Sequence, residues 1–349
     1  MPPPSVPPHR PTLADVAAAA GVAISTASRA LAVPGRGNPD TRDRIIRIAK
    51  DLGYTPTAAS SGDAAPSTRM VAVLVSDVTN PFYFGIIRGT QQALRVAGYS
   101  QILVHTEESP EMEESTLETL RSSYDGAILT ASRLSDERLA ELSAELPLVA
   151  LNRAVPGVPS VFIDTPLGFD QAVEHLASLG HRRICYVAGP PTSWASDLRR
   201  RAVETACERL GIEYTRVGPY QPRTKAGAAA ADAALNTGAT ACVAFNDLLA
   251  IGMLIRLKER GVRVPEDMSI VGCDDIFGAD FCNPPLTTLT APVEQAARVS
   301  VSMLLDRLQS ERVGAGALQR RHIAALPTHL TVRESTGPAP RRQTPEGDS

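Results

Sequence analysis

The chain has 349 residues, of which 43% are hydrophobic and 21% charged, and its formal net charge is -3. This length exceeds what one hydrophobic core usually organises, so two or three domains are expected. The ordinary composition excludes wholesale disorder. The charge is unevenly distributed, with a balance of +3 in residues 1–60 and of -6 in the remainder. This distribution suits a protein that binds an anionic polymer through its basic N-terminal part and a neutral small molecule through its acidic remainder.

The cysteines are scattered, with no C-x-x-C pair and no histidine at metal spacing: Cys185, Cys207, Cys242, Cys273 and Cys282. They are expected to be small buried hydrophobes in a reducing compartment, so we expect no metal site and no cofactor. Residues 1–11 are rich in proline and lack the apolar core of a signal peptide. No stretch approaches 18 uninterrupted apolar residues, so no membrane span is expected. The sequence therefore indicates a cytoplasmic protein with a disordered N-terminal tail.

Three short helices are predicted within residues 12–56. Thr12 and Asp15 form a capping signature, and the helix that follows has one apolar stripe at a spacing of three and four residues. Gly21 supplies a turn before a second helix, roughly Ala23–Ala30. A third helix begins at Asn38-Pro39 and stops at Gly53. Three helices with a glycine turn between the first two are the helix-turn-helix arrangement.

The exposed face of the second helix favours DNA binding. It begins with Ile24 and carries small polar groups and one guanidinium at Ser25, Thr26, Ser28 and Arg29. Such a face can approach phosphates and bases closely, and arginine can donate two hydrogen bonds to guanine. A three-helix bundle with no DNA role is the alternative, and this face argues against it.

Strand–helix alternation begins after a linker at 57–69, where small and polar residues dominate. Predicted strands are Met70–Val75, Gln101–His105, Ala127–Thr130, Leu148–Asn152, Val161–Ile163, Ile184–Ala188, Ala241–Phe245 and Ser269–Cys273. Predicted helices include Phe82–Ala97, Leu167–Leu179, Leu198–Leu210, Ala226–Leu235, Asn246–Arg260 and Val293–Gln309. This alternation predicts an α/β fold with parallel sheets. About ten strands are many for one sheet, so two lobes are expected. Residues 335–349 are predicted to be a disordered tail.

Several motifs resemble the LacI/GalR family of bacterial transcriptional regulators. In the first part they are Thr12–Ala17, Ala20–Val22, Ser28–Leu31 and Gly53–Pro56; in the body they are Ser76–Tyr83, His175-Leu176, Leu179–Ile184, Gly189-Pro190, Ala244–Asp247, Val271–Asp275 and Pro285–Leu289. The resemblance covers about residues 12–334. It implies a helix-turn-helix headpiece and a two-lobed, periplasmic-binding-protein-like domain at 70–334. The lobe boundary would lie near 162–164, with crossovers near 290 and 322.

The resemblance also implies a function, namely a repressor whose operator binding is controlled by a small effector held between the lobes. Thr12 and Tyr54 join the second helix as expected DNA-contacting residues. Two positions depart from the family pattern. Ala23 stands where a capping serine is usual, which typically costs about 1 kcal/mol. Asp63 stands where the family's hinge helix places a leucine wedge, and a carboxylate repels phosphate, so weak operator bending is predicted.

Candidate effector-binding residues follow the predicted strands, because open α/β sheets bind ligands beyond the carboxyl ends of their strands. They are Ser76, Asp77, Asn80, Thr130, Asn152, Arg153, Asn246, Asp247 and Asp274. Phe82 or Trp194 is expected to offer an apolar surface to a ring. The family resemblance adds Arg199. Carboxylates, amides and guanidinium groups together suit a sugar or another polyhydroxylated metabolite. For each residue the alternative is a structural role, such as a helix cap at Asn246.

An enzyme is not expected, because the sequence contains no P-loop, nucleophile elbow, H-E-x-x-H motif or dinucleotide fingerprint. His181 lies in a basic turn, where a structural or surface role is expected. The competing function is a sugar receptor with no DNA role, against which the headpiece and the missing signal peptide argue. A homodimer reading a pseudo-palindromic operator is predicted, because one headpiece makes few contacts. No leucine heptad follows Thr331, which favours a dimer over a tetramer.

Overall fold

We analysed a computed structural model of the whole chain, which describes residues 12–32, 39–52, 67–119, 121, 123–313 and 323–340. The chain divides into two compact units, Met1–Ser67 and Thr68–Ser349. The predictions for residues 1–11, Tyr54, Asp63 and most of the linker fall outside the described residues.

The first unit is a helix-turn-helix, as the sequence predicts. Its helices are α1 (Leu13–Ala20), α2 (Ile24–Ala32) and α3 (Pro39–Asp51). Thr12 and Asp15 form a reciprocal capping box at the start of α1. Gly21 ends α1 with a φ of 61°, a left-handed conformation that glycine adopts without strain. Small side chains let the helices approach closely around a core of Val16, Ala17, Ala20, Ala27, Ala30, Ile45 and Ala49.

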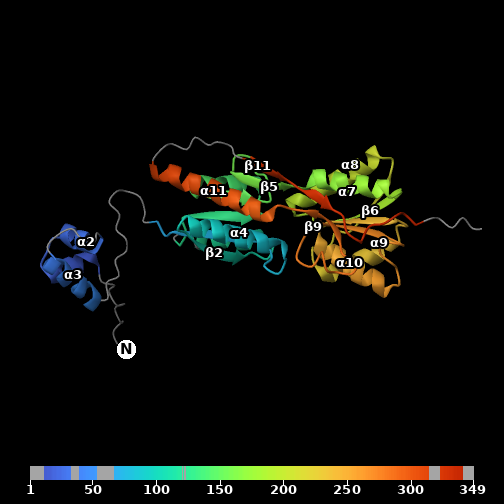
Figure 1. Cartoon of the computed structure of the whole chain (residues 1–349). Helices are drawn as coiled ribbons and strands as arrows, with labels where there is room; N and C mark the ends of the chain where they lie inside the picture. Colours follow the sequence, from blue (N-terminus) through green and yellow to red (C-terminus); the bar gives the residue numbers. More distant parts are fainter. Residues whose placement is uncertain are drawn as a thin grey trace, which may run out of the picture. The chain divides into compact units, whose positions relative to one another are not determined.

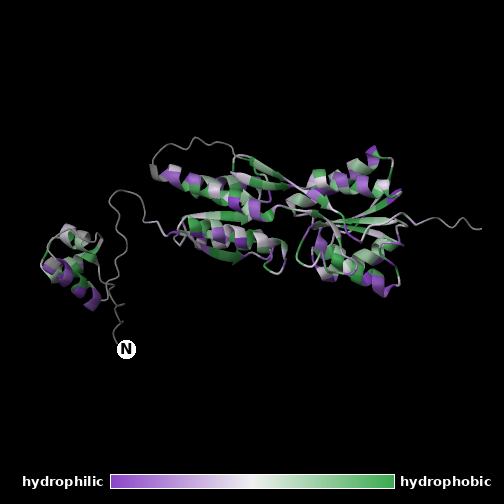
Figure 2. Ribbon diagram, viewed as in Figure 1, coloured by the Kyte–Doolittle hydropathy of each residue, from purple (hydrophilic) through white to green (hydrophobic). Residues whose placement is uncertain are grey.

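Lobe 1 of the second unit is a parallel sheet in the order β11-β5-β4-β3-β1-β2. Its elements are β1 (Met70–Val75), α4 (Phe82–Val96), β2 (Ser100–His105), α5 (Pro110–Thr119), β3 (Gly126–Thr130), α6 (Asp136–Glu145), β4 (Leu148–Leu151), β5 (Ser160–Asp164), α11 (Val293–Val313) and β11 (Ile323–Pro327). Helices α4 and α11 cover one face over one apolar core, and α5 and α6 cover the other. The strands are the predominantly hydrophobic layer between these helices (Figures 1 and 2).

Lobe 2 repeats this architecture in the order β12-β10-β9-β8-β6-β7, with only β12 antiparallel among the described strands. Its elements are α7 (Thr165–Ser178), β6 (Arg183–Val187), α8 (Trp194–Arg209), β7 (Glu213–Val217), the 3-10 turn η1 (Thr224–Ala226), α9 (Gly227–Leu235), β8 (Ala241–Ala244), α10 (Asp247–Glu259), β9 (Ser269–Asp274), β10 (Thr287–Thr290) and β12 (His329–Thr331). Helices α7 and α8 cover one face, and α9 and α10 cover the other. Buried side chains of β6, β8 and β9 supply the centre of both cores.

Three chain crossings join the lobes. The first follows Asp164 at the end of β5, and the second lies between β10 and α11. The third is at Thr328, between β11 and β12, and not near 322 as predicted. The Thr328 hydroxyl donates to the Asp164 carbonyl at 2.9 Å, so the first and third crossings lie side by side. This narrow connection places the carboxyl ends of both sheets against each other.

The predicted tail is wrong for residues 335–340, which pack on lobe 2. Ser335 is fully buried, and its hydroxyl donates to the Ile270 carbonyl at 2.6 Å. The Gly337 carbonyl lies 3.1 Å from Nε2 of His181. His181 is itself fully buried and also contacts Thr240, so its role is structural. Satisfied backbone and side-chain hydrogen bonds order this segment despite its proline- and glycine-rich sequence.

The sequence prediction did not identify helices α5 and α6 or strands β7, β10, β11 and β12. Within the described segments, no helix is long and apolar enough to cross a membrane. These segments also hold no group of three or more His, Cys, Asp or Glu side chains that could take a metal ion. Four cysteines are buried and Cys282 is partly buried, all with free thiols.

Candidate functional site

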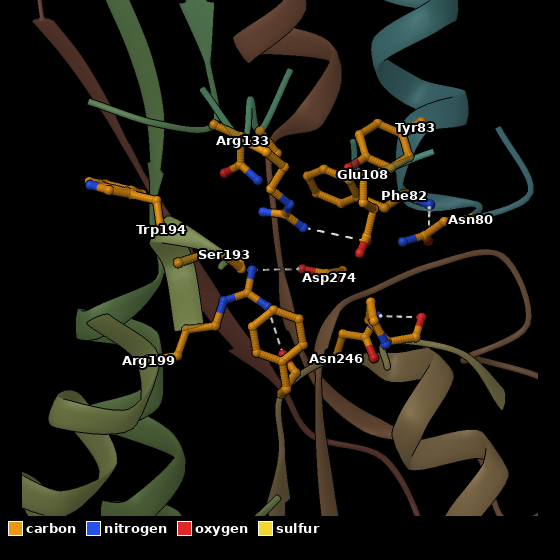
Figure 3. A pocket seen from close by; sticks show the side chains of 15 residues that line it. Asn80, Phe82, Tyr83, Glu108, Arg133, Ser193, Trp194, Arg199, Asn246 and Asp274 are labelled. Atoms are coloured by element: carbon orange, nitrogen blue, oxygen red, sulfur yellow. Dashed lines mark hydrogen bonds and ion pairs between the residues drawn. The ribbon is translucent and has the colours of Figure 1, made fainter. Parts of the chain in front are cut away.

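A pocket opens between the two lobes, with about 520 Å³ of space including its solvent-facing part. Both lobes contribute to its walls (Figure 3). The lining residues are Asn80, Phe82, Tyr83, Glu108, Ala131, Arg133 and Asn152 from lobe 1, and Ser193, Trp194, Ala195, Arg199, Pro222, Phe245, Asn246 and Asp274 from lobe 2.

The pocket lies at the carboxyl ends of the strands in both sheets. In lobe 1 its walls follow β1, β2, β3 and β4, and in lobe 2 they follow β6, β7 and β8 and end β9. Four of the lining residues other than glycine have positive φ: Glu108 (61°), Ala131 (52°), Asn152 (59°) and Asp274 (115°). Such conformations cost free energy and concentrate at functional sites. Their gathering here supports a binding role for this edge.

A buried ion pair forms the lobe 2 wall. Arg199 in α8 donates through Nη2 to Oδ1 of Asp274 at 3.2 Å and through Nη1 to the Phe245 carbonyl at 2.6 Å. Its guanidinium also lies 4.7 Å from the centre of the Phe245 ring. Burial raises the pKa of Asp274, and the adjacent Arg199 opposes that rise. The pair presents one fixed donor and one fixed acceptor to the pocket.

Amides and aromatic rings complete the predicted set. The Asn246 side chain accepts from the Leu249 backbone N–H at 3.1 Å, so it caps α10 and lines the pocket at once. Asn80 accepts from the Phe82 backbone N–H at 3.0 Å and turns the chain into α4. Trp194 packs edge-on against a neighbouring ring 6.0 Å away. Amide groups beside ring faces suit a ligand with hydroxyls on an apolar frame.

Five other candidates are not part of the pocket lining. One of them is Asp247, which is fully buried and accepts from the Thr288 hydroxyl. Arg153 turns into lobe 1, where it donates to the Ser132 and Leu134 carbonyls and pairs with Asp136. These acceptors satisfy both terminal nitrogens of the buried guanidinium group. The remaining three are Ser76, whose hydroxyl donates to the Thr130 carbonyl; Thr130 itself; and Asp77, which accepts from the Thr79 backbone N–H and hydroxyl.

Sequence reasoning missed two charged lining residues and a phenol in lobe 1. Glu108 follows β2 and Arg133 follows β3, and they form an ion pair at 3.4 Å. Each lies three residues beyond the last residue of its strand, and the strand-end rule was not extended that far after β2 and β3. Tyr83 lies beside them, and burial raises the pKa of its hydroxyl to about 12, so it remains a neutral donor.

The start of α2 is the candidate DNA-binding face of the first unit. Ile24 is 55% exposed and Ser25 is exposed, whereas Ala27 is fully buried. Thr12 is exposed at the start of α1. Ser28 and Arg29 lie in α2, and their side chains, like Tyr54, fall outside the described groups. An exposed large aliphatic residue beside small polar ones leaves room for close approach to a groove.

Comparisons with known proteins agree with both units. The model of the "Bacterial regulatory proteins, lacI family" matches residues 12–57, and that of the "Periplasmic binding protein-like domain" matches residues 173–336. The HTH-type transcriptional repressor CytR of Escherichia coli is 32% identical over 94% of this chain and 97% of its own length. The HTH-type transcriptional regulator CelR of Thermobifida fusca is 34% identical over 94% and 98%.

Solved structures give the same result. A complex of the transcriptional regulator CelR with cellobiose is 32% identical, with a TM-score of 0.67 over 93% of this chain and all of the other. The lac repressor dimer bound to operator and an anti-inducer is 25% identical, with a TM-score of 0.71 over 94% and 100%. These relatives are transcriptional regulators, in agreement with the expectation that the chain is no enzyme, and they disfavour a receptor without a DNA role. The chain belongs to the LacI family of bacterial regulatory proteins and is a helix-turn-helix transcriptional regulator.

Proposed function

We propose that this chain represses transcription by binding an operator through its headpiece, under control of a small effector held between the lobes. The observation that carries the proposal is the pocket lined by both lobes, in a chain that also has a helix-turn-helix. A ligand contacting both lobes has different affinity for different lobe orientations. It therefore shifts the population of those orientations by that difference.

At the DNA end, the second helix enters the major groove. Ile24, Ser25 and Thr26 lie at its start, and Ser28 and Arg29 follow one turn later. Base edges are read by Arg29 and the small hydroxyls, and Thr12 and Tyr54 contact the backbone. Because the operator lies on the chromosome, the proposed site of action is the cytoplasm.

At the effector end, we propose a sugar or related metabolite. Asn80, Asn246, Arg199 and Asp274 supply donors and acceptors, and Phe82 and Trp194 supply ring faces. Related chains are solved with cellobiose and with ribose. Hydroxyl groups match this mixture of amide, carboxylate and guanidinium groups.

We further propose a homodimer on a pseudo-palindromic operator. The related lac repressor is solved as a dimer on its operator. The second unit exposes large apolar side chains that a single copy leaves in water: Phe84 on α4, Ile255 on α10, and the edge-stacked Phe277 and Phe281. Two copies present two recognition helices to successive major grooves.

The proposal is tested with the full-length protein and fragments of its own genome. We expect nuclease protection of a pseudo-palindromic fragment, lost or gained when cellobiose, ribose or another sugar is added. Arg29→Ala should weaken operator binding by about 1–3 kcal/mol, which is roughly 5- to 150-fold. Lys258→Ala removes a positive charge from α10 and is the control that should leave protection unchanged. No protected fragment at any salt concentration would refute the DNA role.

A further inference from the structure

Two ion pairs, one from each lobe, line the same pocket. Arg199 and Asp274 of lobe 2 form one, with side chains 5% and 7% exposed. Arg133 and Glu108 of lobe 1 form the other, with side chains 7% and 20% exposed. In Figure 3 both pairs reach into the space between the lobes. The pocket therefore offers a guanidinium and a carboxylate from each side.

Both guanidinium groups retain unused hydrogen-bonding capacity. Nε of Arg133 and Nε of Arg199 are buried, and neither has a partner among the described residues. A buried donor without an acceptor costs free energy. Both arginines line the pocket, where a guanidinium group can donate to a ligand that brings acceptor oxygens.

The backbone holds Glu108 in place at a cost. Glu107 and Glu108 adopt consecutive left-handed conformations, with φ of 53° and 61°. A residue other than glycine pays for this conformation, and two in succession are retained where the surroundings fix them. The consequence is that the Glu108 carboxylate faces the pocket beside Arg133, whereas Glu107 is exposed.

The charges of the lining cancel. Arg133 and Arg199 contribute two positive charges, and Glu108 and Asp274 contribute two negative ones. The other described lining residues are neutral. A phosphate or carboxylate placed at the lobe 1 end would lie against Glu108, where repulsion is strong because little solvent screens it. A hydroxyl there can donate to Glu108 and accept from Arg133.

We propose that Glu108 is a specificity-determining residue. Together with Arg133 it binds the hydroxyl-bearing end of an uncharged polyol, and its charge excludes phosphorylated or carboxylated analogues. This inference rests on the proposed effector role of the pocket. A neutral sugar and a neutral nucleoside share the required chemistry, because each carries adjacent hydroxyls and no charge. The panel of ligands below separates these two sources.

The first test is a ligand panel on the full-length protein, read by thermal shift and titration calorimetry. It contains glucose, glucose 6-phosphate, glucuronate, ribose, ribose 5-phosphate, cellobiose, uridine and uridine monophosphate. We expect a neutral member to bind at least about 100-fold more tightly than its charged partner. Glu108→Gln should reduce this ratio of affinities by about 10-fold or more. Glu107→Gln, a neighbour with the same backbone conformation outside the pocket, should leave it unchanged.

The second test does not depend on identifying the effector. Glu108→Gln gives the pocket one net positive charge, so this variant should gain stabilisation by inorganic phosphate over chloride of equal ionic strength. Phosphate should not stabilise the wild type or Glu107→Gln in this way. The double variant Glu108→Gln/Arg133→Gln should lose the stabilisation by phosphate that Glu108→Gln gains.

Preferential binding of a charged member by the wild type would overturn the proposal, as would an equal phosphate response in Glu107→Gln. A panel with no binder at all would also overturn the assigned ligand class. The regulator function would in that case still be decided separately, by nuclease protection of genomic fragments.

Discussion

Nε of Arg223 lies 3.8 Å from Oδ2 of Asp77, so a lobe 2 arginine faces a lobe 1 carboxylate across the mouth of the cleft. Of the ion pairs found in the described segments, it alone joins the two lobes. Asp77 is held in the loop after β1 by the backbone N–H and hydroxyl of Thr79. Arg223 precedes η1, and its side chain is 63% exposed. The residue predicted to touch the effector is thus one half of a contact between lobes.

Loss of this contact should loosen the lobe orientation slightly. Exposed pairs contribute about 0–1 kcal/mol, so Arg223→Ala should shift the ratio of lobe orientations by up to about fivefold. Spin labels on Gln92 of α4 and Glu208 of α8, both exposed, report this as a broader distance distribution. In 0.5 M salt the wild type should approach the variant, because salt screens exposed charges.

The control for this measurement is Arg216→Ala, which removes an exposed arginine from β7 in lobe 2. It should leave the distance distribution unchanged. An Arg223→Ala distribution identical to that of the wild type at low salt would show that the pair does not hold the lobes.

A second prediction concerns Asp247, which is fully buried behind the lobe 2 wall. Its carboxyl group accepts from the Thr288 hydroxyl at 2.6 Å and from the Ile276 backbone N–H at 2.9 Å. Burial, and then the charge of Asp274, raise its pKa from 3.8 to about 7. The folded state thus keeps a proton that the unfolded state has lost. The free energy of unfolding should fall as the pH rises from about 4 to about 7.

Asp247→Asn should remove this loss, because an amide is neutral and can still accept from Ile276 and donate to Thr288. The variant should match the wild type below pH 4. At pH 8 it should be more stable by at most about 4 kcal/mol, since one pKa unit corresponds to about 1.4 kcal/mol. Urea unfolding of the full-length protein across this pH range measures the effect.

Asp267→Asn is the matched control. The Arg263 side chain lowers the pKa of Asp267 to about 2, so its ionised form favours the folded state. Asp267→Asn removes that charge, so this variant should not be more stable than the wild type at any pH. If Asp247→Asn were less stable than the wild type at pH 8, the buried carboxyl would be acting as a required acceptor and not as a strained charge.

The sequence predicted the strand ends better than the directions of side chains. The strand-end rule brought Asn80, Asn246 and Asp274 to the pocket, because parallel strands open at the same edge. It failed at Arg153, whose guanidinium is drawn inward by carbonyl acceptors that no local pattern reveals. It missed Glu108, whose position depends on two left-handed residues. A contact with a distant segment decides the first case, and local backbone conformation decides the second.

The missed strands have a similar cause. Strand β10 consists of three threonines and a leucine, yet Thr287 and Thr288 are fully buried. Their hydroxyls are satisfied by Thr336 and Asp247, which lie far along the chain. Strand β7 is an edge strand in which no residue is fully buried. Strand β10 was not predicted because its composition is polar, and β7 was not predicted because it is a short edge strand. Strand propensity depends on such context.

A third prediction isolates the ion pair of lobe 2. Arg199→Met leaves Asp274 buried without its partner, and this should destabilise the second unit by roughly 3–5 kcal/mol. In the double variant Arg199→Met/Asp274→Asn the unpaired buried charge is removed, so at least half of the lost free energy of unfolding should be restored. Chemical denaturation of the wild type, both single variants and the double variant measures the coupling as a double-mutant cycle. A double variant less stable than the sum of the single changes would contradict this account.

The fourth prediction concerns the first unit, where Ala23 directly precedes α2. The Ala23 carbonyl already accepts from the Thr26 and Ala27 backbone N–H groups at 2.8 and 3.1 Å, but its methyl side chain offers no acceptor. A serine there can accept from the Thr26 N–H, so Ala23→Ser should stabilise α2 by about 1 kcal/mol. Amide hydrogen exchange at Thr26 and Ala27 in the full-length protein should slow by about fivefold.

The reciprocal change tests the same physics on α1. Asp15 accepts from both the backbone N–H and the hydroxyl of Thr12 at 2.7 Å, which completes a capping box. Thr12→Val should therefore destabilise α1 by about 1 kcal/mol, and exchange at Asp15 and Val16 should accelerate. Unchanged exchange in Ala23→Ser would mean that packing of Ala27 and Ala30 alone fixes the start of α2. In that case the absence of a capping serine would cost this headpiece nothing.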